Sequence, residues 1–352
     1  YNKNEVNKMQ GTMKAVIYNG IKDVSIENLP IPQIGDDDIL VKNLRAGICG
    51  TDIGAYMHGG DSYAIFPGNE FGHEMVSVVV EKGENVADDI QIGDYVFINP
   101  MTCKKAGASR ADTAGAFSEY VNVENAKTFY NVYVLDKSLE LDTAVIIEPL
   151  SVGTNGAIHQ GVKLSDKVVV LGAGTIGLSA AAGLLARGLK NVCVVDINDW
   201  RLAKAKEIGA LTVNNKSEKL LDKLKEYFGT VRNMMGTEVP DVDLYVDAAG
   251  FEPMLQEVFA NGRQGTKYSI VAVYGRPISL DASFFIINEA RIEGSCGYND
   301  SVLREVIDHL TQKKTAVNTI VTSKFKLKDF QEAIETAVKA DNNIKVIIDY
   351  EA

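Results

Sequence analysis

Cysteine and long apolar runs are both scarce in this sequence of 352 residues. Four cysteines in a chain of this length do not suggest a disulfide framework, and they fit a reducing cytoplasm best. No apolar run reaches the roughly 18 to 20 residues that a membrane-spanning helix needs. The residues before Met13 are polar and contain no apolar signal segment, so we expect Met13 to be the natural start.

Basic residues are also in the minority. Lys and Arg number 36 against 47 Asp and Glu, which gives a formal net charge of −11. This charge argues against nucleic acid and anionic membranes as partners. Hydrophobic residues make up 46% of the chain and charged residues 24%, as is ordinary for a soluble globular protein.

The pattern of apolar residues changes part-way along the chain. From Met13 to about Val123, short alternating apolar runs are broken by Pro and Gly, which is typical of a mainly β, barrel-like domain. From about Lys167, strands and helices alternate, which predicts a parallel doubly wound sheet. The C-terminal segment, with an apolar strand at 344–348, is expected to return and complete the first domain. The predicted fold class is therefore α/β, with a catalytic domain over 13–152 and 297–352 and a Rossmann domain over 153–296.

A glycine-rich turn follows the apolar strand predicted at 167–171. The turn reads Gly-Ala-Gly-Thr-Ile-Gly, and Asp196 ends the next strand nineteen residues after its last glycine. Gly172 allows the tight turn, Gly174 lets the backbone approach a pyrophosphate, and Gly177 lets helix and strand pack closely. Asp196 can accept both ribose hydroxyls of NAD and would repel the 2′-phosphate of NADP. The predicted cofactor-binding residues are Gly172, Gly174, Thr175, Ile176, Gly177, Asp196 and Arg201, the last flanking the adenosine.

Three segments ahead of this turn carry candidate metal ligands. Cys49 lies in the first, His73 and Glu74 in the second, and Glu148 in the third. One thiolate, one imidazole and one or two carboxylates suit tetrahedral Zn²⁺ with a position left for water or substrate. From their spacing alone, the interpretation that these residues form a metal site and the interpretation that they are unrelated are about equally supported, because the candidates are far apart in sequence.

The motifs around these residues follow one another in a recognisable order. They are Cys-Gly-Thr-Asp at 49–52, Gly-His-Glu at 72–74, Gly-Ala-Phe-Ser-Glu-Tyr at 115–120, Glu-Pro-Leu at 148–150 and the turn at 172–177. From Met13 to the C-terminus, the chain resembles the zinc-dependent medium-chain dehydrogenases/reductases of the alcohol dehydrogenase superfamily. It is most similar to their polyol (sorbitol) dehydrogenase branch. The resemblance implies a GroES-like catalytic domain, a Rossmann domain and a catalytic zinc ion.

The resemblance also implies a role for each candidate. Cys49, His73 and Glu148 would surround the zinc ion, and Glu74 would either ligate it or exchange with water and substrate. Asp52 would orient His73 and fix its tautomer. The catalytic residues it implies are Thr51, as the first station for the alcohol proton, with Asp52 and Glu74.

The chain departs from the family pattern at three places. The usual structural-zinc lobe carries four closely spaced cysteines, but 99–115 contains only Cys103, so we predict one catalytic ion and no structural zinc. Many relatives carry a histidine where this chain has Gly54, which leaves the proton route beyond Thr51 open. Polyol enzymes tend to place an arginine near the position of Gly297, and its absence weakens sorbitol itself as the substrate.

The resemblance implies an NAD-dependent alcohol or polyol dehydrogenase that interconverts a secondary alcohol and its ketone by hydride transfer. L-threonine 3-dehydrogenase and 2,3-butanediol dehydrogenase are alternatives within this class. Rivals from other classes are a zinc-free NADPH quinone reductase and a non-catalytic binding protein of the same fold. By analogy with zinc-dependent relatives, we expect a homodimer or homotetramer.

Overall fold

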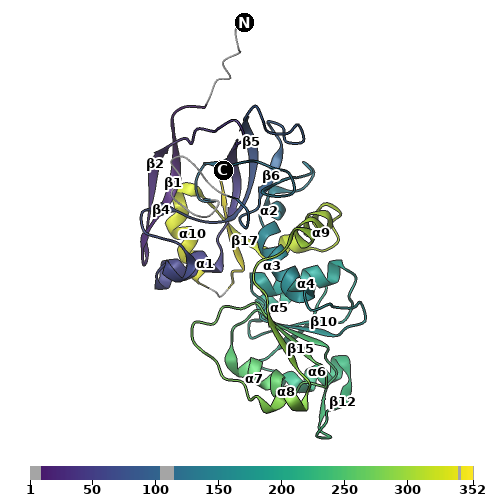
Figure 1. Ribbon diagram of the computed structural model, residues 1–352. Helices are drawn as coiled ribbons and strands as arrows, with labels where there is room; N and C mark the ends of the chain where they lie inside the picture. Colours follow the sequence, from purple (N-terminus) through teal and green to yellow (C-terminus); the bar gives the residue numbers. More distant parts are fainter. Residues whose placement is uncertain (1–8, 104–114, 340–341, 352) are drawn as a thin grey trace. The chain divides into compact units, whose positions relative to one another are not determined.

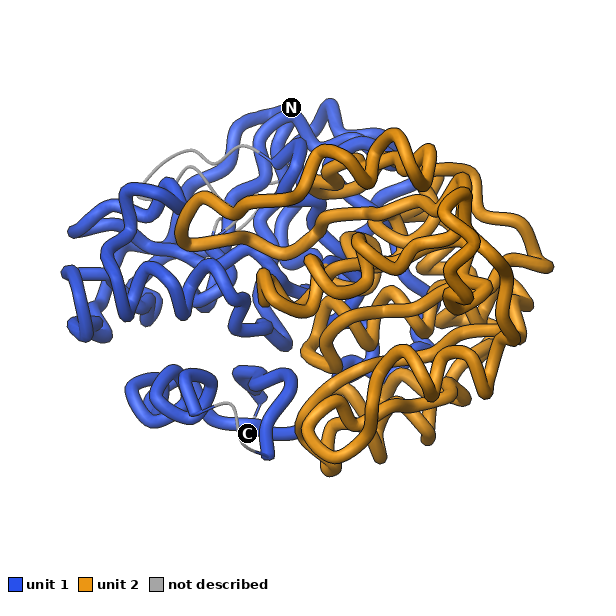
Figure 2. Tube along the Cα trace, turned by 90° about the horizontal axis from the view of Figure 1, so that it is seen from below, with its two compact units in different colours: residues 1–148, 321–352 blue, residues 149–320 orange. Residues whose placement is uncertain are grey.

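The computed structural model describes residues 9–103, 115–339 and 342–351 (Figure 1). The chain divides into two compact units, one of Tyr1–Glu148 with Val321–Ala352 and the other of Pro149–Ile320 (Figure 2). The predicted fold class is confirmed: one unit is rich in strands, and the other is built on a parallel sheet. Within the described ranges, no helix has the length and apolar character that crossing a bilayer requires.

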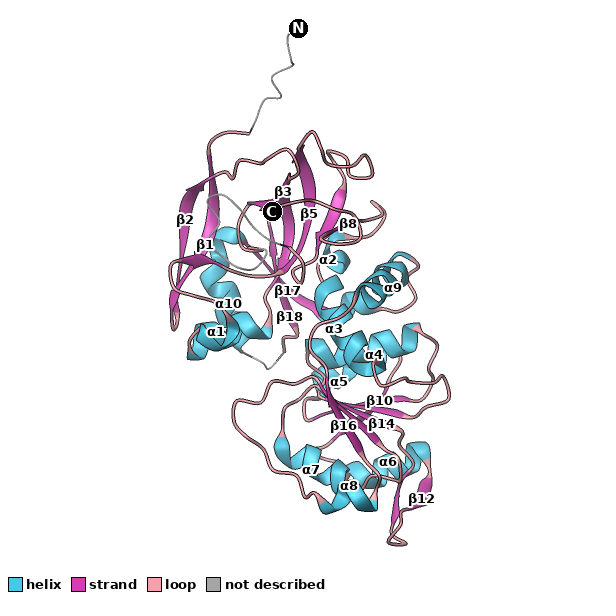
Figure 3. Cartoon of the chain, viewed as in Figure 1, coloured by secondary structure: helices cyan, strands magenta, loops and turns pink. Residues whose placement is uncertain are grey.

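The first unit is built mainly of strands (Figure 3). Its elements are β1 (Thr12–Gly20), β2 (Asp23–Pro30), β3 (Ile39–Gly47), α1 (Gly50–His58), η1 (Asp61–Tyr63), β4 (Asn69–Glu70), β5 (Glu74–Lys82), β6 (Tyr95–Ile98), β7 (Tyr120–Val123), β8 (Val132–Val134), α2 (Leu141–Ala144), β17 (Val321–Lys326), η3 (Leu327–Asp329), α10 (Phe330–Val338) and β18 (Lys345–Asp349). Among the described residues, one sheet has the order β17-β18-β3-β5-β6-β8 with β7 also paired to β3, and another has the order β2-β1-β4.

The C-terminal segment from Val321 packs with the rest of the first unit. β18 pairs antiparallel with β3, with Ile347 opposite Gly47. The preceding helix α10 buries Phe330 against Phe71 and Phe117, with ring centroids 5.8 and 4.7 Å away. Residues far apart in sequence therefore share one core, and β18 lies beside the strand that leads to Cys49.

The second unit is a doubly wound sheet with helices on both faces (Figure 3). Its elements are α3 (Ile147–Ile158, which begins in the first unit), β9 (Val168–Leu171), α4 (Thr175–Ala186), β10 (Val192–Asp196), α5 (Asp199–Ile208), β11 (Leu211–Asn214), α6 (Leu220–Phe228), β12 (Thr230–Arg232), β13 (Glu238–Pro240), β14 (Leu244–Asp247), α7 (Glu252–Ala260), β15 (Lys267–Ile270), α8 (Ser283–Ile287), β16 (Arg291–Gly294), α9 (Asp300–Thr311) and η2 (Val317–Ile320). The strands of its parallel sheet have the order β11-β10-β9-β14-β15-β16.

This strand order reverses direction next to β9. The chain builds outward from β9 through β10 and β11, and then returns to the other side of β9 with β14. In doubly wound sheets, ligands bind outside the carboxyl ends of the strands at such a switch point. Gly172 follows β9 and Asp247 ends β14, so these two residues flank the switch point. The strand predicted at 167–171 corresponds to β9, and the predicted alternation of strands and helices is observed, while the apolar run at 268–274 extends past the end of β15 at Ile270.

The second unit extends to Ile320, whereas the predicted Rossmann domain ended at residue 296. Helix α9 is therefore part of the same compact unit as the parallel sheet. Arg187, at the end of α4, donates two 2.6 Å hydrogen bonds to Glu305 of α9. Thr319 of η2 donates to Glu207 of α5. These polar contacts hold 297–320 to the second unit, and sequence periodicity carries no signal for them.

Candidate functional site

The junction of β3 and β5 positions two of the predicted ligands. Gly47 at the end of β3 is paired in register with Glu74 at the start of β5. A Cβ on Gly47 would collide with the carboxylate of Glu74, so glycine is needed there. Cys49 then caps α1, and its N–H donates to Oδ2 of Asp52 at 2.8 Å. Cys49 thus lies at the helix N-terminus, where partial positive charge favours an anionic group.

Three of the four predicted metal ligands come together in the first unit. The thiol sulfur of Cys49, a ring nitrogen of His73 and a carboxylate oxygen of Glu74 all lie within 4.8 Å of one another. Ligands of one tetrahedral zinc ion stand about 3.3–3.8 Å apart, so a small adjustment suffices for all three to share an ion. Glu148, at the start of α3, is not part of this set, but its charge acts on His73.

Buried charge dominates this cluster. Burial raises the pKa of Asp52 to about 6, against the opposing charge of His73. Burial likewise raises the pKa of Glu148 to about 7. Burial disfavours the charged form of His73, but Cys49, Asp52 and Glu148 together raise its pKa well above the usual value. Several anionic groups share a small buried volume, and a bound divalent cation would relieve their repulsion. The donor set therefore fits Zn²⁺.

Lys345 of β18 is a member of this cluster that sequence reasoning missed. Its ammonium donates to both carboxylate oxygens of Glu74, at 2.8 and 2.7 Å, and to the backbone oxygen of Ile48 at 2.9 Å. Lys345 is 2% exposed and Glu74 0%. A lysine inside the apolar strand at 344–348 was the available signal, because an ammonium group is rarely buried without a partner. Both oxygens of Glu74 are thus engaged by Lys345.

Thr51 and Asp52 each present a buried oxygen beside Cys49. Oγ1 of Thr51 and Oδ1 of Asp52 have no hydrogen-bond partner within the described part of the chain. A hydroxyl both donates and accepts, so the Thr51 side chain suits the transfer of a proton. One helical turn beyond Thr51, Gly54 packs directly against the ring of Tyr63, and any side chain at residue 54 would collide with that ring. This contact explains why the chain has no histidine at that position.

The glycine-rich turn adopts the geometry that its sequence predicts. Gly172 has φ of +100°, which favours glycine, and Gly174 forms the N-cap of α4. A Cβ on Gly177 would collide with the backbone oxygen of Gly172, so helix and turn pack closely only without a side chain. The first turn of α4, which carries Thr175 and Ile176, therefore lies at the carboxyl edge of β9. A helix N-terminus in this position is suited to phosphate.

Asp196 connects the end of β10 to that turn. Its Oδ2 accepts from the N–H of Ala173 at 2.7 Å, and its Oδ1 accepts from Ile197 and Asn198 at 2.8 and 2.9 Å. A carboxylate has about four acceptor positions, so one remains for a ribose hydroxyl. Arg201 lies in the first turn of α5, where its N–H donates to the capping Asn198 side chain at 3.2 Å.

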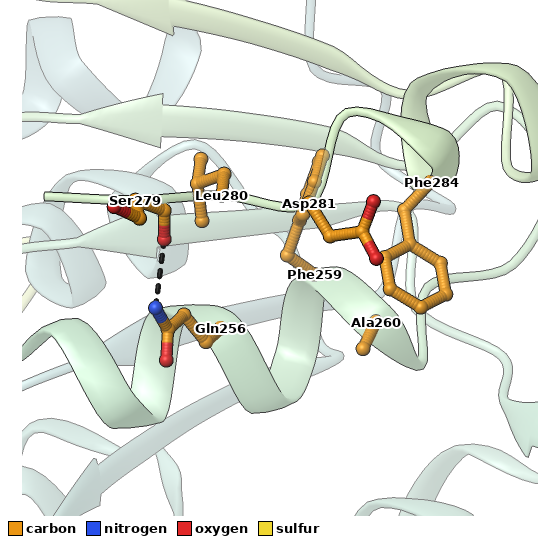
Figure 4. Close-up of a pocket in the computed structure, with 7 residues that line it drawn as sticks. All are labelled: Gln256, Phe259, Ala260, Ser279, Leu280, Asp281 and Phe284. Atoms are coloured by element: carbon orange, nitrogen blue, oxygen red, sulfur yellow. Dashed lines mark hydrogen bonds between the residues drawn. The ribbon is translucent and has the colours of Figure 1, made fainter.

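A pocket of about 440 Å³ lies within the second unit, over α7 and the loop before α8 (Figure 4). Gln256 spans its edge and donates to the backbone oxygen of Ser279 at 2.7 Å. The rings of Phe259 and Phe284 lie 6.2 Å apart in its wall. None of its lining residues belongs to the metal cluster or the glycine-rich turn. The pocket is mainly apolar, and it is separate from the predicted site residues.

The predicted short lobe at 99–115 falls largely outside the described residues, since 104–114 are not described. Cys103 itself is buried in the core of the first unit. Its position matches a packed residue better than a ligand of an exposed lobe. The prediction of a single zinc ion therefore stays a prediction.

Comparison with known families and proteins agrees with these features. Residues 35–132 match the alcohol dehydrogenase GroES-like domain, and residues 175–312 match the zinc-binding dehydrogenase family. Sorbitol dehydrogenase of Bacillus subtilis (strain 168) is 29% identical over 356 residues, covering 96% of this chain and 97% of the relative. Sorbitol dehydrogenase of Bos taurus is 30% identical over 351 residues, covering 95% of each chain.

Solved structures show the same architecture. 2R,3R-butanediol dehydrogenase from Bacillus subtilis superposes with a TM-score of 0.81 at 24% identity, covering 96% of this chain and 99% of that one. A short chain alcohol dehydrogenase from E. coli CFT073, solved with NADH, has a TM-score of 0.80 at 26% identity, with the same coverage. The chain belongs to the zinc-dependent alcohol dehydrogenase family of medium-chain dehydrogenases/reductases. Within that family it is polyol dehydrogenase-like, and it is an oxidoreductase of the zinc type.

Proposed function

We propose that this protein interconverts a secondary alcohol and its ketone, with NAD as the hydride acceptor and one zinc ion in the first unit. The carrying observation is the cluster of half-buried Cys49 and His73 with buried Glu74, beside which the hydroxyl of Thr51 has no hydrogen-bond partner among the described residues. Polyols, diols and sugar-derived alcohols form the proposed substrate class, because the relatives include sorbitol and 2R,3R-butanediol dehydrogenases.

Each candidate residue of the first unit has a different proposed role. Cys49 and His73 hold the metal, and either Glu74 or Glu148 supplies a carboxylate. A zinc ion bound there supplies Lewis acidity, which lowers the pKa of an alcohol. Thr51 accepts the alcohol proton and passes it on. Asp52 positions Cys49 through its N–H and has a second oxygen left to orient His73.

NAD rather than NADP is the proposed cofactor. The Asp196 carboxylate stands at the end of β10 and already accepts three N–H groups, so it is fixed in place. A fixed negative charge beside the adenosine ribose accepts hydroxyls and repels a 2′-phosphate. Gly172, Gly174, Thr175, Ile176, Gly177 and Arg201 complete the proposed cofactor site.

A second candidate substrate class is the amino alcohol, because an L-threonine 3-dehydrogenase from Bacillus velezensis is 25% identical over 97% of this chain. A zinc-free quinone reductase or a non-catalytic binding protein is disfavoured, since neither needs a thiol, an imidazole and a carboxylate within 4.8 Å of one another. A panel of polyols, diols, threonine and sugar acids with NAD⁺ or NADP⁺, followed by the absorbance of NADH or NADPH, tests the substrate and the cofactor together. Absence of turnover with every alcohol would overturn the proposal.

The metal ligands need a separate test. We expect about one zinc ion per chain by elemental analysis, and loss of zinc in Cys49→Ser and His73→Ala. Glu74→Gln and Glu148→Gln then identify the carboxylate ligand, because only the variant of the true ligand loses affinity for zinc. In the cobalt-substituted protein, a thiolate-to-cobalt charge-transfer band would report Cys49 directly, and its absence would exclude that residue.

We propose a homodimer or homotetramer. β16 is the last strand of the parallel sheet, and Ile286 of α8, the helix that precedes β16 in the chain, is 76% exposed. Exposed apolar residues beside an unpaired strand edge are typical of a subunit contact. Light scattering coupled to size-exclusion chromatography measures the mass, and Ile286→Lys should lower it. A monomeric wild-type protein would contradict the proposal.

A further inference from the structure

The side chain of Asp247 fastens two loops at the carboxyl edge of the second unit's sheet. Its Oδ1 accepts from the N–H groups of Ala249 and Gly250, each at 3.1 Å. Its Oδ2 accepts from the hydroxyl of Tyr274 at 2.5 Å. The first contacts fix the turn after β14, and the last one fixes the loop after β15. We call Asp247 and Tyr274 the loop clamp.

The backbone of Asp247 explains why β15 ends early. The apolar run at 268–274 predicts a longer strand, yet β15 ends at Ile270. The backbone oxygen of Asp247 accepts from both Val271 and Ala272, each at 2.9 Å, so the next register position of the ladder is lost. The chain then turns, and this turn brings the Tyr274 hydroxyl onto the carboxylate. The loop after β15 is therefore held at its start and at its end.

Within the clamp, Asp247 is buried and both of its carboxylate oxygens accept hydrogen bonds. Asp247 is 1% exposed, and a carboxylate buried to this degree needs donors to offset its lost hydration. Burial, together with the hydrogen bond and charge of Asp247, raises the pKa of Tyr274 above its usual value. The hydroxyl therefore stays protonated and remains a donor at neutral pH. Such a short bond to a charged group restricts both partners strongly.

The clamp also reaches the glycine-rich turn. Ala248 donates from its N–H to the backbone oxygen of Leu171 at 2.9 Å. Ala249, whose N–H donates to Asp247, packs closely against Gly172. A Cβ added to Gly172 would lie 3.1 Å from the Cα and the Cβ of Ala249. The loop clamp and the proposed phosphate site thus share one wall at the switch point.

The layout of this edge assigns the clamp to one end of the cofactor. Asp196 takes the adenosine ribose on the β10 side, and the first turn of α4 takes the pyrophosphate in front of β9. A dinucleotide bound across the switch point must then direct its other nucleoside toward β14 and β15. We propose that Asp247 and Tyr274 are positioning residues. They hold the loop Val271–Gly275 in place as the surface against which the nicotinamide end of the cofactor binds. This inference rests on the proposed NAD function.

Comparing two ligands tests the inference. NADH carries the nicotinamide end, whereas ADP-ribose carries only the adenosine and the phosphates. In Tyr274→Phe we expect the dissociation constant of NADH, measured by its fluorescence, to rise on the order of 10–100-fold, the effect of one lost hydrogen bond to a charged group. The dissociation constant of ADP-ribose, measured by calorimetry, should stay within about twofold, because Asp247 still accepts from Ala249 and Gly250 in this variant and so keeps the wall beside Gly172 in place. Asp247→Asn should show the same selectivity.

Tyr245→Phe is the matched control. Tyr245 is a buried tyrosine of the same sheet whose hydroxyl has no hydrogen-bond partner in the described chain, so its removal should change neither constant. The double variant of Asp247 and Tyr274 should bind NADH no more weakly than Asp247→Asn alone, since both changes remove the same hydrogen bond from a hydroxyl to a carboxylate. Equal weakening of both ligands in Tyr274→Phe, or none, would overturn the clamp's role. A wild-type protein that binds neither ligand would overturn the proposed function, and the clamp's role with it.

Discussion

The two units hold their functional groups in opposite ways. In the first unit, side chains carry the chemistry: the thiol of Cys49, the imidazole of His73 and the carboxylate of Glu74 are gathered beside the ammonium group of Lys345. In the second unit, the backbone carries it, through the N–H groups of a helix N-terminus and through glycines that leave space. The first arrangement depends on balanced buried charge, and the second on shape.

This difference separates the effects that mutations should have. A buried charge that loses its partner costs several kcal/mol, because the low-dielectric interior cannot screen it. A lost backbone contact is shared among many neighbouring bonds, so its effect is smaller and more local. Substitutions in the first unit should therefore affect metal content, stability and turnover together. Substitutions at the nucleotide edge should change the affinity and selectivity for the cofactor and leave the metal in place.

The largest expected effect comes from removing a metal ligand. In Cys49→Ser and in His73→Ala, kcat should fall about 10³-fold or more, because several kcal/mol of Lewis-acid stabilisation are lost. NADH binding should stay within about twofold of wild type, since the ligand residues lie in the other unit. Steady-state rates, zinc content and NADH fluorescence measure the three quantities. Cys296→Ser, at an exposed cysteine, is the control and should keep full activity and zinc. Wild-type rates in either ligand variant would refute the metal site.

Removing the buried ammonium group should come next in size. In Lys345→Met, the carboxylate of Glu74 stays buried without its partner, which should lower the free energy of unfolding of the metal-free protein by about 3–5 kcal/mol. Zinc should restore part of this loss, because the ion neutralises the same carboxylate. Urea unfolding with and without zinc measures both values. Lys324→Met is the control, since Lys324 is 40% exposed and its removal should cost about 1 kcal/mol at most. If the free energy of unfolding fell by the same amount with and without zinc, Glu74 would be excluded as a zinc ligand.

Asp196 tests the second unit. In Asp196→Ala, the ratio of kcat/KM for NAD to that for NADP should fall on the order of 10–100-fold, as a charge-assisted hydrogen bond to ribose is lost and a repulsion is removed. Zinc content should not change. Asp199→Ala offers a comparison three residues along, where the carboxylate accepts from Asn214 rather than facing the turn. If the wild-type enzyme already prefers NADP, the proposed role of Asp196 is wrong.

The same contrast explains what could be predicted from sequence. The glycine-rich turn and Asp196 form one local strand–helix–strand segment, and backbone rules predict its geometry without knowledge of the rest of the fold. The metal cluster could be assembled only through a family resemblance, because spacing does not say which distant residues meet. Lys345 was missed since it is 271 residues from Glu74 and reaches it only when β18 pairs with β3. Tyr274 was missed for a similar reason, as its partner Asp247 is 27 residues away on the neighbouring strand.

The smallest expected effect tests whether a change at the C-terminal end of α4 affects cofactor binding at its N-terminal end. Arg187 and Glu305 join this end of the helix to α9, and both side chains remain partly exposed. In Glu305→Gln, the free energy of unfolding should fall by about 1 kcal/mol, and less at high salt, because solvent screens the pair. α4 has 12 residues, so about 18 Å of helix separate this pair from the glycine-rich turn. The dissociation constant of NADH should therefore not change. A clear change would show that α4 transmits strain along its length. The shape of the nucleotide-binding edge would then depend on this ion pair as well as on the glycines.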